Sequence, residues 1–176
     1  MKNKRLYKIC ICSFFVAVIA VCAQISFVTP FSSIPFNLAL LGVFLAGGFL
    51  GEVLGSICVI IYILLGFLGI PVFAGFMAGP SVLFGPTGGF IIGYIFVAFI
   101  TGVFSRKFKN RPFYNFLGMG SGLLICYIFG ALWYMNIGKI PLLFAFTSSV
   151  LPFIIGDFIK IFASLILLKR LDKFIL

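Results

Sequence analysis

Three clusters of basic residues divide this chain into long stretches that carry almost no charge. An apolar stretch of about 20 residues is long enough to cross a bilayer as a helix, and flanking basic residues remain on the cytoplasmic side. The stretch from Lys8 to Arg106 accommodates four such helices, and the stretch from Arg111 to Lys169 accommodates two. Even numbers of crossings place all three clusters on one side. The clusters are Lys2, Lys4, Arg5 and Lys8; Arg106, Lys107, Lys109 and Arg111; and Lys169, Arg170 and Lys173.

The composition also indicates a protein of the lipid bilayer. Hydrophobic residues make up 63% of the chain and charged residues only 9%, whereas a soluble domain carries about 25% charged residues. The net charge of +10 comes from clusters beside apolar segments, which favours membrane topology over nucleic-acid binding. We therefore predict an all-α membrane protein: residues 1–176 form a single domain of six transmembrane helices, with both termini cytoplasmic.

Glycine and proline residues mark the ends of the predicted helices. The second helix is expected to start near Pro35, because proline suits a first helical turn. Glycines around Gly51 are expected to form the turn between the second and third helices, and the third helix is expected to end near Gly69. The segment 70–87 is too rich in Gly and Pro to be helical throughout, and such backbone is tolerated at membrane depth only where it is buried or lines a cavity. The other predicted helices cover about 6–28, 88–105, 113–135 and 146–168.

The residue inventory excludes most enzymatic chemistry. The chain has no histidine and only three acidic residues, so Ser-His and Cys-His dyads and histidine-based zinc sites cannot form. It also lacks a P-loop motif for ATP phosphates, so any ATP is bound by other subunits. The five cysteines lie in apolar stretches and indicate small buried side chains. We predict no enzyme, no resident cofactor and no metal site.

Two charged residues lie within the last predicted helix. Asp157 and Lys160 are three residues apart and therefore share a helix face. Charges at this depth are costly, which makes them candidates for function. They either fix helix packing as a neutral pair, or relay protons, or form the polar floor of a ligand site. In the last case Lys160 meets a carboxylate and Asp157 accepts hydrogen bonds from N–H donors.

Two further patterns are candidates for binding surfaces. The run from Gly85 to Phe90, which contains Thr87, Gly88 and Gly89, offers bare backbone groups beside a helix N-terminus, an arrangement that suits a polar ligand. Phe73 is a candidate wall of an apolar cavity. Small residues also line the first helix at Ser13, Ala17 and Ala20. They form either a docking face for another membrane subunit or ordinary internal packing.

Several segments resemble one known family in the same order along the chain. The segment from Tyr62 to Gly75 (YILLGFLGIPVFAG) is similar to the BioY family, the biotin-specific S components of energy-coupling-factor (ECF) transporters. The runs 79–80 and 85–90 fit the Gly/Pro-rich stretch of that family. Pro152-Phe153 followed by Gly156, Asp157 and Lys160 resembles its last-helix signature.

This resemblance implies a six-helix protein of a bacterial or archaeal plasma membrane that captures biotin from outside the cell with high affinity. It implies partners as well: a coupling transmembrane subunit, which faces Ser13, Ala17 and Ala20, and two cytoplasmic ATPases. The implied ligand contacts are Asp157, Lys160, Gly88, Gly89 and Phe90.

The chain departs from the family pattern at three places near the expected site. Phe90 stands where relatives usually have tyrosine, and Ile91 stands where some have arginine. The start of the second helix keeps one polar group, Asn37, which we also count as a candidate contact. Two other functions stay open from the residues alone. One is a stand-alone proton-coupled secondary transporter of a small carboxylated vitamin, and the other is a membrane assembly protein without a ligand.

Overall fold

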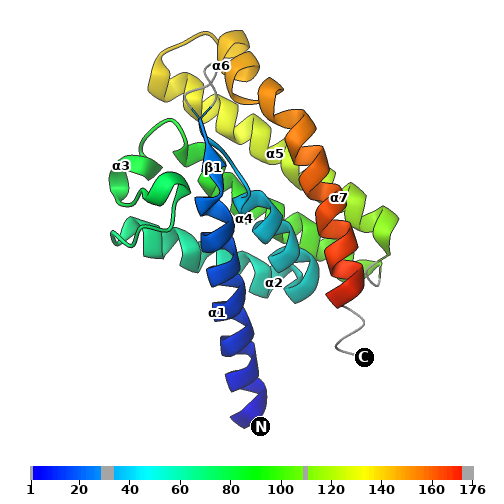
Figure 1. Cartoon of the computed structure of the whole chain (residues 1–176). Helices are drawn as coiled ribbons and strands as arrows, with labels where there is room; N and C mark the ends of the chain where they lie inside the picture. The colour runs from blue at the N-terminus through cyan, green and yellow to red at the C-terminus, as the bar shows by residue number, and fades with distance from the viewer. Residues whose placement is uncertain (1, 29–33, 109–110, 172–176) are drawn as a thin grey trace.

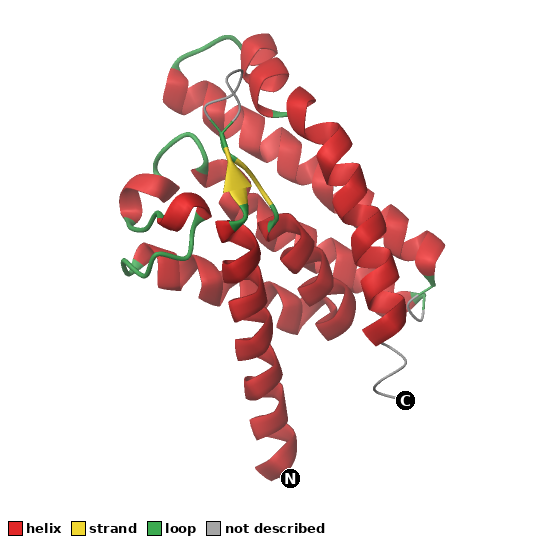
Figure 2. Ribbon diagram, in the orientation of Figure 1, coloured by secondary structure: helices red, strands yellow, loops and turns green. Residues whose placement is uncertain are grey.

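The computed structural model describes residues 2–28, 34–108 and 111–171, with side chains from residue 5 onward. Lys109, Asp172 and Lys173 therefore lie outside the described residues. The fold is almost entirely helical, as predicted (Figures 1 and 2). The long helices are α1 (Lys2–Gln24), α2 (Ala39–Phe67), α4 (Gly88–Lys107), α5 (Pro112–Gly138) and α7 (Ile154–Leu171). The short elements are β1 (Ser26–Phe27), β2 (Phe36–Asn37), α3 (Pro80–Leu83), α6 (Leu142–Ser149) and the 3-10 turns Ala74–Phe76 and Leu151–Phe153.

Five helical segments among the described residues are long and apolar enough to cross a membrane. They are Arg5–Gln24, Ala39–Phe67, Gly88–Lys107, Pro112–Gly138 and Leu142–Leu171. Apolar helices of this length are typical of membrane-spanning segments, and the chain is an integral membrane protein.

Helix α2 reverses direction at Gly51, as the glycine pattern predicts. Gly51 has φ 81° and ψ −179°, a backbone conformation that favours glycine. A Cβ atom on Gly55 would lie 2.8 Å from the Cα of Gly47, whereas eight residues of a straight helix span about 12 Å. The segment is therefore a helical hairpin whose arms, 39–50 and 52–67, correspond to the predicted second and third helices.

The hairpin turn and the ends of α4 and α7 lie at one end of the bundle. Arg106 at the end of α4 donates a hydrogen bond to Glu52 (Nη1 to Oε1, 2.6 Å). Leu168 of α7 packs closely on Gly48. A Cβ atom on Gly48 would lie 2.5 Å from Cδ1 of Leu168. The start of α1 points toward the same end (Figure 1). The cytoplasmic placement of this end and the count of six crossings stay predictions.

The chain between α1 and α2 forms a small antiparallel pair rather than extended helix ends. Ser26 pairs with Asn37 and Phe27 pairs with Phe36. The first helix therefore ends at Gln24 rather than near residue 28, and the second begins at Ala39 rather than near Pro35. The Asn37 side chain explains the later start, because its Oδ1 accepts a hydrogen bond from the N–H of Ala39 (2.9 Å). This Asx-type turn favours an extended residue before the helix.

The segment 70–87 is irregular, as predicted, and one side chain of α1 fastens it to the bundle. Gln24 Nε2 donates to the carbonyl of Pro71 (3.3 Å), and its Oε1 accepts the N–H of Phe76 (2.9 Å). One glutamine amide thus holds both sides of the loop that contains the turn Ala74–Phe76.

We expect Gln24→Leu to free this loop. Losing the hydrogen bond to the Phe76 N–H removes about 1 kcal/mol, which corresponds to roughly fivefold faster exchange of that amide. Gln24→Glu is the matched control, because it keeps the acceptor oxygen. Hydrogen–deuterium exchange of the peptide 70–79 measures the effect. Equal exchange in the leucine variant and the wild type would show that the amide does not hold the loop.

The last predicted helix, 146–168, is wrong as a continuous element. Helix α6 ends at Ser149, a 3-10 turn covers Leu151–Phe153, and α7 begins at Ile154. Pro152 explains the break, because it has no N–H to donate and its ring clashes with a preceding helical turn. As a result, α7 starts beside the pocket described below, and Asp157 falls in its first turn.

Candidate functional site

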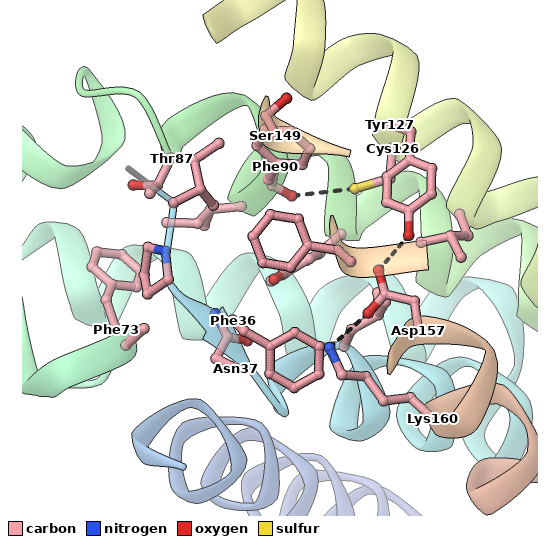
Figure 3. Close-up of a pocket in the computed structure, with 18 of the residues that line it drawn as sticks. Phe36, Asn37, Phe73, Thr87, Phe90, Cys126, Tyr127, Ser149, Asp157 and Lys160 are labelled. Atoms are coloured by element: carbon pink, nitrogen blue, oxygen red, sulfur yellow. Dashed lines mark hydrogen bonds and ion pairs between the residues drawn. The ribbon is translucent and has the colours of Figure 1, made fainter. Parts of the chain in front are cut away.

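A pocket opens at the end of the bundle remote from the α2 hairpin turn. Its walls come from β2, both arms of α2, the loop after α2, and helices α3, α4, α5, α6 and α7 (Figure 3). The space between its lining atoms, with the open solvent at its mouth included, amounts to about 720 Å³. The apolar lining consists of Ile34, Pro35, Phe36, Leu40, Phe73, Ala74, Met77, Val82, Phe90, Ile91, Leu123, Cys126 and Phe153. The polar lining consists of Asn37, Tyr62, Thr87, Tyr94, Tyr127, Ser149, Asp157 and Lys160.

The two charged residues of α7 form a buried ion pair in this pocket. Lys160 Nζ lies 2.6 Å from Asp157 Oδ1, as their i,i+3 spacing on one helix allows. The residues are only 4% and 5% exposed. Burying two charges costs desolvation free energy even when they are paired. Apolar residues at these two positions of α7 would avoid that cost, so the pair calls for a functional reason.

Tyr127 of α5 completes the surroundings of the carboxylate. Its hydroxyl donates to Asp157 Oδ2 at 2.5 Å, so each carboxylate oxygen has one protein donor. Sequence reasoning did not select this residue. The available signal was a tyrosine within the otherwise apolar stretch 122–133 of α5, and a buried tyrosine hydroxyl usually finds a partner.

Phe36 of β2 covers the ammonium group. Lys160 Nζ lies 3.9 Å from the centre of its ring, within the range of a cation–π contact. Figure 3 shows the ring beside the end of the lysine side chain. Phe36 was also not selected from the sequence, because nothing in the pattern brings residue 36 next to residue 160.

The structure brings most of the predicted contact residues to this pocket. Asn37, Phe73, Thr87 and Phe90 line it together with the ion pair. The Thr87 hydroxyl donates to the carbonyl of Val82 (3.2 Å), which positions the loop before α4. Their roles in binding stay predictions.

Gly88 and Gly89 are the predicted contacts that do not line the pocket. A Cβ atom on Gly88 would lie 1.7 Å from the carbonyl oxygen of Leu83, and one on Gly89 would lie 2.3 Å from Cβ of Trp133. The two glycines therefore let the start of α4 pack against α3 and α5. Their closest contacts are within the protein, behind the wall that Phe90 presents to the pocket.

The small residues of α1 lie outside the pocket. Ser13 and Ala17 are exposed, and Ala20 is half-buried. A docking face for another membrane helix is compatible with this exposure, and it stays a prediction. Among the described residues, no group of three potential ligands could hold a metal ion.

Comparison with known proteins gives a consistent assignment. The model of the BioY family matches residues 1–176. The chain is 39% identical to a probable biotin transporter BioY of Pyrococcus horikoshii, covering 90% of this chain and 91% of that protein. It is 37% identical to the biotin transporter BioY of Thermotoga maritima, covering 90% and 92%. These relatives are named as transporters, in agreement with the prediction that the chain is not an enzyme.

A solved structure agrees with the same assignment. The crystal structure of the S component for biotin from an ECF-type ABC transporter superposes with a TM-score of 0.91 at 30% sequence identity. The match covers 98% of this chain and 94% of the other. The predicted all-α membrane fold is thereby confirmed.

Proposed function

This chain belongs to the BioY family, and from that membership we propose that it captures biotin from outside the cell with high affinity. In this proposal it is the substrate-specific subunit of an ATP-driven ECF-type transporter in the cell membrane. Residues 1–176 act as a single substrate-binding domain. The chain binds no nucleotide itself, so a coupling transmembrane subunit and two ATPase subunits supply the energy. Ser13, Ala17 and Ala20 form the face toward the coupling subunit.

The buried Asp157–Lys160 pair is the observation that carries this proposal. A neutral, apolar ligand would need no such pair, and a packing role alone would need no pocket beside it. The ureido group of biotin presents N–H donors and a carbonyl acceptor side by side. A carboxylate and an ammonium 2.6 Å apart offer the complementary acceptor and donor, and each retains hydrogen-bonding capacity beyond its present partners.

The distance between the two charges favours one orientation of biotin. The ureido and carboxylate groups of biotin are separated by the fused ring and the whole side chain, so an extended molecule cannot place one at Asp157 and the other at Lys160. We therefore assign both charged residues to the ureido end. The expectation that Lys160 meets the carboxylate is the alternative orientation, and in the orientation proposed here Asn37 and Thr87 are candidate partners for the other end.

Calorimetry of the purified protein with biotin, without ATP or partner subunits, tests the capture function. We expect one-to-one binding with a nanomolar Kd, because the pocket is preformed in the isolated chain. Protein that is folded by circular dichroism yet binds no biotin would refute the proposal.

The orientation is tested by comparing biotin with its methyl ester in the wild type and in Lys160→Met. If Lys160 binds the ureido group, the ratio of the two affinities is the same in both proteins, although both ligands bind the variant more weakly. If Lys160 binds the carboxylate, the wild type prefers biotin and the variant loses that preference. Lys139→Met is the control, since Lys139 is exposed and does not line the pocket.

A further inference from the structure

The ring of Phe36 lies beside the Lys160 ammonium group. The Nζ atom of Lys160 lies 3.9 Å from the centre of the Phe36 ring and 2.6 Å from Asp157 Oδ1. The lysine side chain is buried, so these contacts act at a site with little water. A cation held over a ring face under such conditions is attracted more strongly than at an exposed surface.

The ring has little freedom to leave this position. It stacks on Phe153 with an interplanar angle of 14° and a centroid distance of 6.0 Å, and it contacts Phe27 at 4.9 Å. The strand pair β1–β2 fixes its backbone. On the side of α7, a Cβ atom on Gly156 would lie 2.3 Å from Phe36 Cε2, so only glycine at position 156 leaves space for the ring.

We propose that Phe36 is a positioning residue for Lys160. Its ring face holds the ammonium beside Asp157, so that the pair presents a donor and an acceptor at a fixed spacing toward the pocket. The consequence for biotin rests on the function proposed above, whereas the contact itself belongs to the unliganded protein. Phe36 thereby links the segment between α1 and α2 to the charged end of the site.

Fluorination of the ring tests this role with almost no change of shape. Phenylalanine carrying one, two or three fluorine atoms is introduced at position 36, because each fluorine withdraws charge from the ring face. We expect the unfolding temperature of the unliganded protein to fall stepwise along the series. We also expect biotin affinity to fall stepwise, with the trifluorinated protein binding roughly tenfold more weakly. The same series at Phe44 is the control, because this ring is fully buried but does not line the pocket.

Ordinary substitutions extend the test. Phe36→Tyr retains a ring face and is expected to bind biotin nearly as the wild type does. Phe36→Leu removes the face, and Gly156→Ala displaces the ring without touching a polar group. Both are expected to weaken binding by a similar factor.

The outcomes separate this inference from the proposed function. Wild-type protein that binds biotin, with flat responses to fluorination at Phe36, would overturn the inference and leave the function standing. Wild-type protein that binds no biotin would refute the function. In that case the unfolding temperatures decide: a stepwise fall supports the Phe36–Lys160 contact, and a flat series overturns it.

Discussion

Replacing Asp157 with alanine is expected to weaken biotin binding by more than about a hundredfold, because removing one partner of a buried charge pair costs 2–5 kcal/mol or more. The substitution removes the acceptor for Lys160 (2.6 Å) and for the Tyr127 hydroxyl (2.5 Å). It leaves the ammonium buried beside the Phe36 ring. Calorimetry with biotin measures the loss of affinity. Asp157→Asn preserves the shape and is expected to fold while binding more weakly.

The double variant Asp157→Leu/Lys160→Met separates binding from stability. Breaking a buried pair destabilises a protein by about 3–5 kcal/mol, whereas replacing both members by apolar groups is often neutral. We therefore expect each single substitution to lower the unfolding temperature, and the double variant to recover most of it while failing to bind biotin. A double variant that unfolds as easily as either single variant would indicate that the pair is mainly a packing device.

Replacing Gly102 with alanine is expected to destabilise the fold by about 3 kcal/mol, the upper part of the usual range for overpacking. Gly102 of α4 faces the hairpin turn of α2. A Cβ atom there would lie 2.2 Å from the N of Glu52 and 2.4 Å from the C of Gly51. These neighbours are backbone atoms, so the turn itself would have to move. Thermal unfolding followed by circular dichroism in detergent measures the change.

Gly120→Ala is the matched control for this prediction. Gly120 also lies inside a long helix, α5, but a Cβ atom there would meet nothing within 4 Å. Alanine is favoured over glycine in a helix by about 1 kcal/mol, so this variant is expected to be at least as stable as the wild type. If the two substitutions lowered stability equally, close packing of α4 on the α2 turn would not be the cause.

The candidate site was only partly predictable from the chain. Asp157 and Lys160 were found because charge is rare in this sequence, and their i,i+3 spacing places them on one helix face whatever the rest of the fold does. In the structure Gly88 and Gly89 let the start of α4 pack against α3 and α5, and a ligand contact through them stays a prediction. A glycine pattern indicates that another group packs closely against the backbone, but it does not show whether that group is a ligand or another helix.

The membrane character, the all-helical fold and the reversal near Gly51 can all be predicted from the amino-acid pattern. Each follows from local quantities: the length of an apolar stretch, the placement of basic residues and the backbone freedom of glycine. The contact of Phe36 with Lys160 and the hydrogen bond from Tyr127 to Asp157 became visible only in the three-dimensional fold. These residues come from separate elements, and hydropathy does not predict which faces of apolar helices pack against one another. That choice depends on side-chain packing in three dimensions, and here it completes the surroundings of both buried charges.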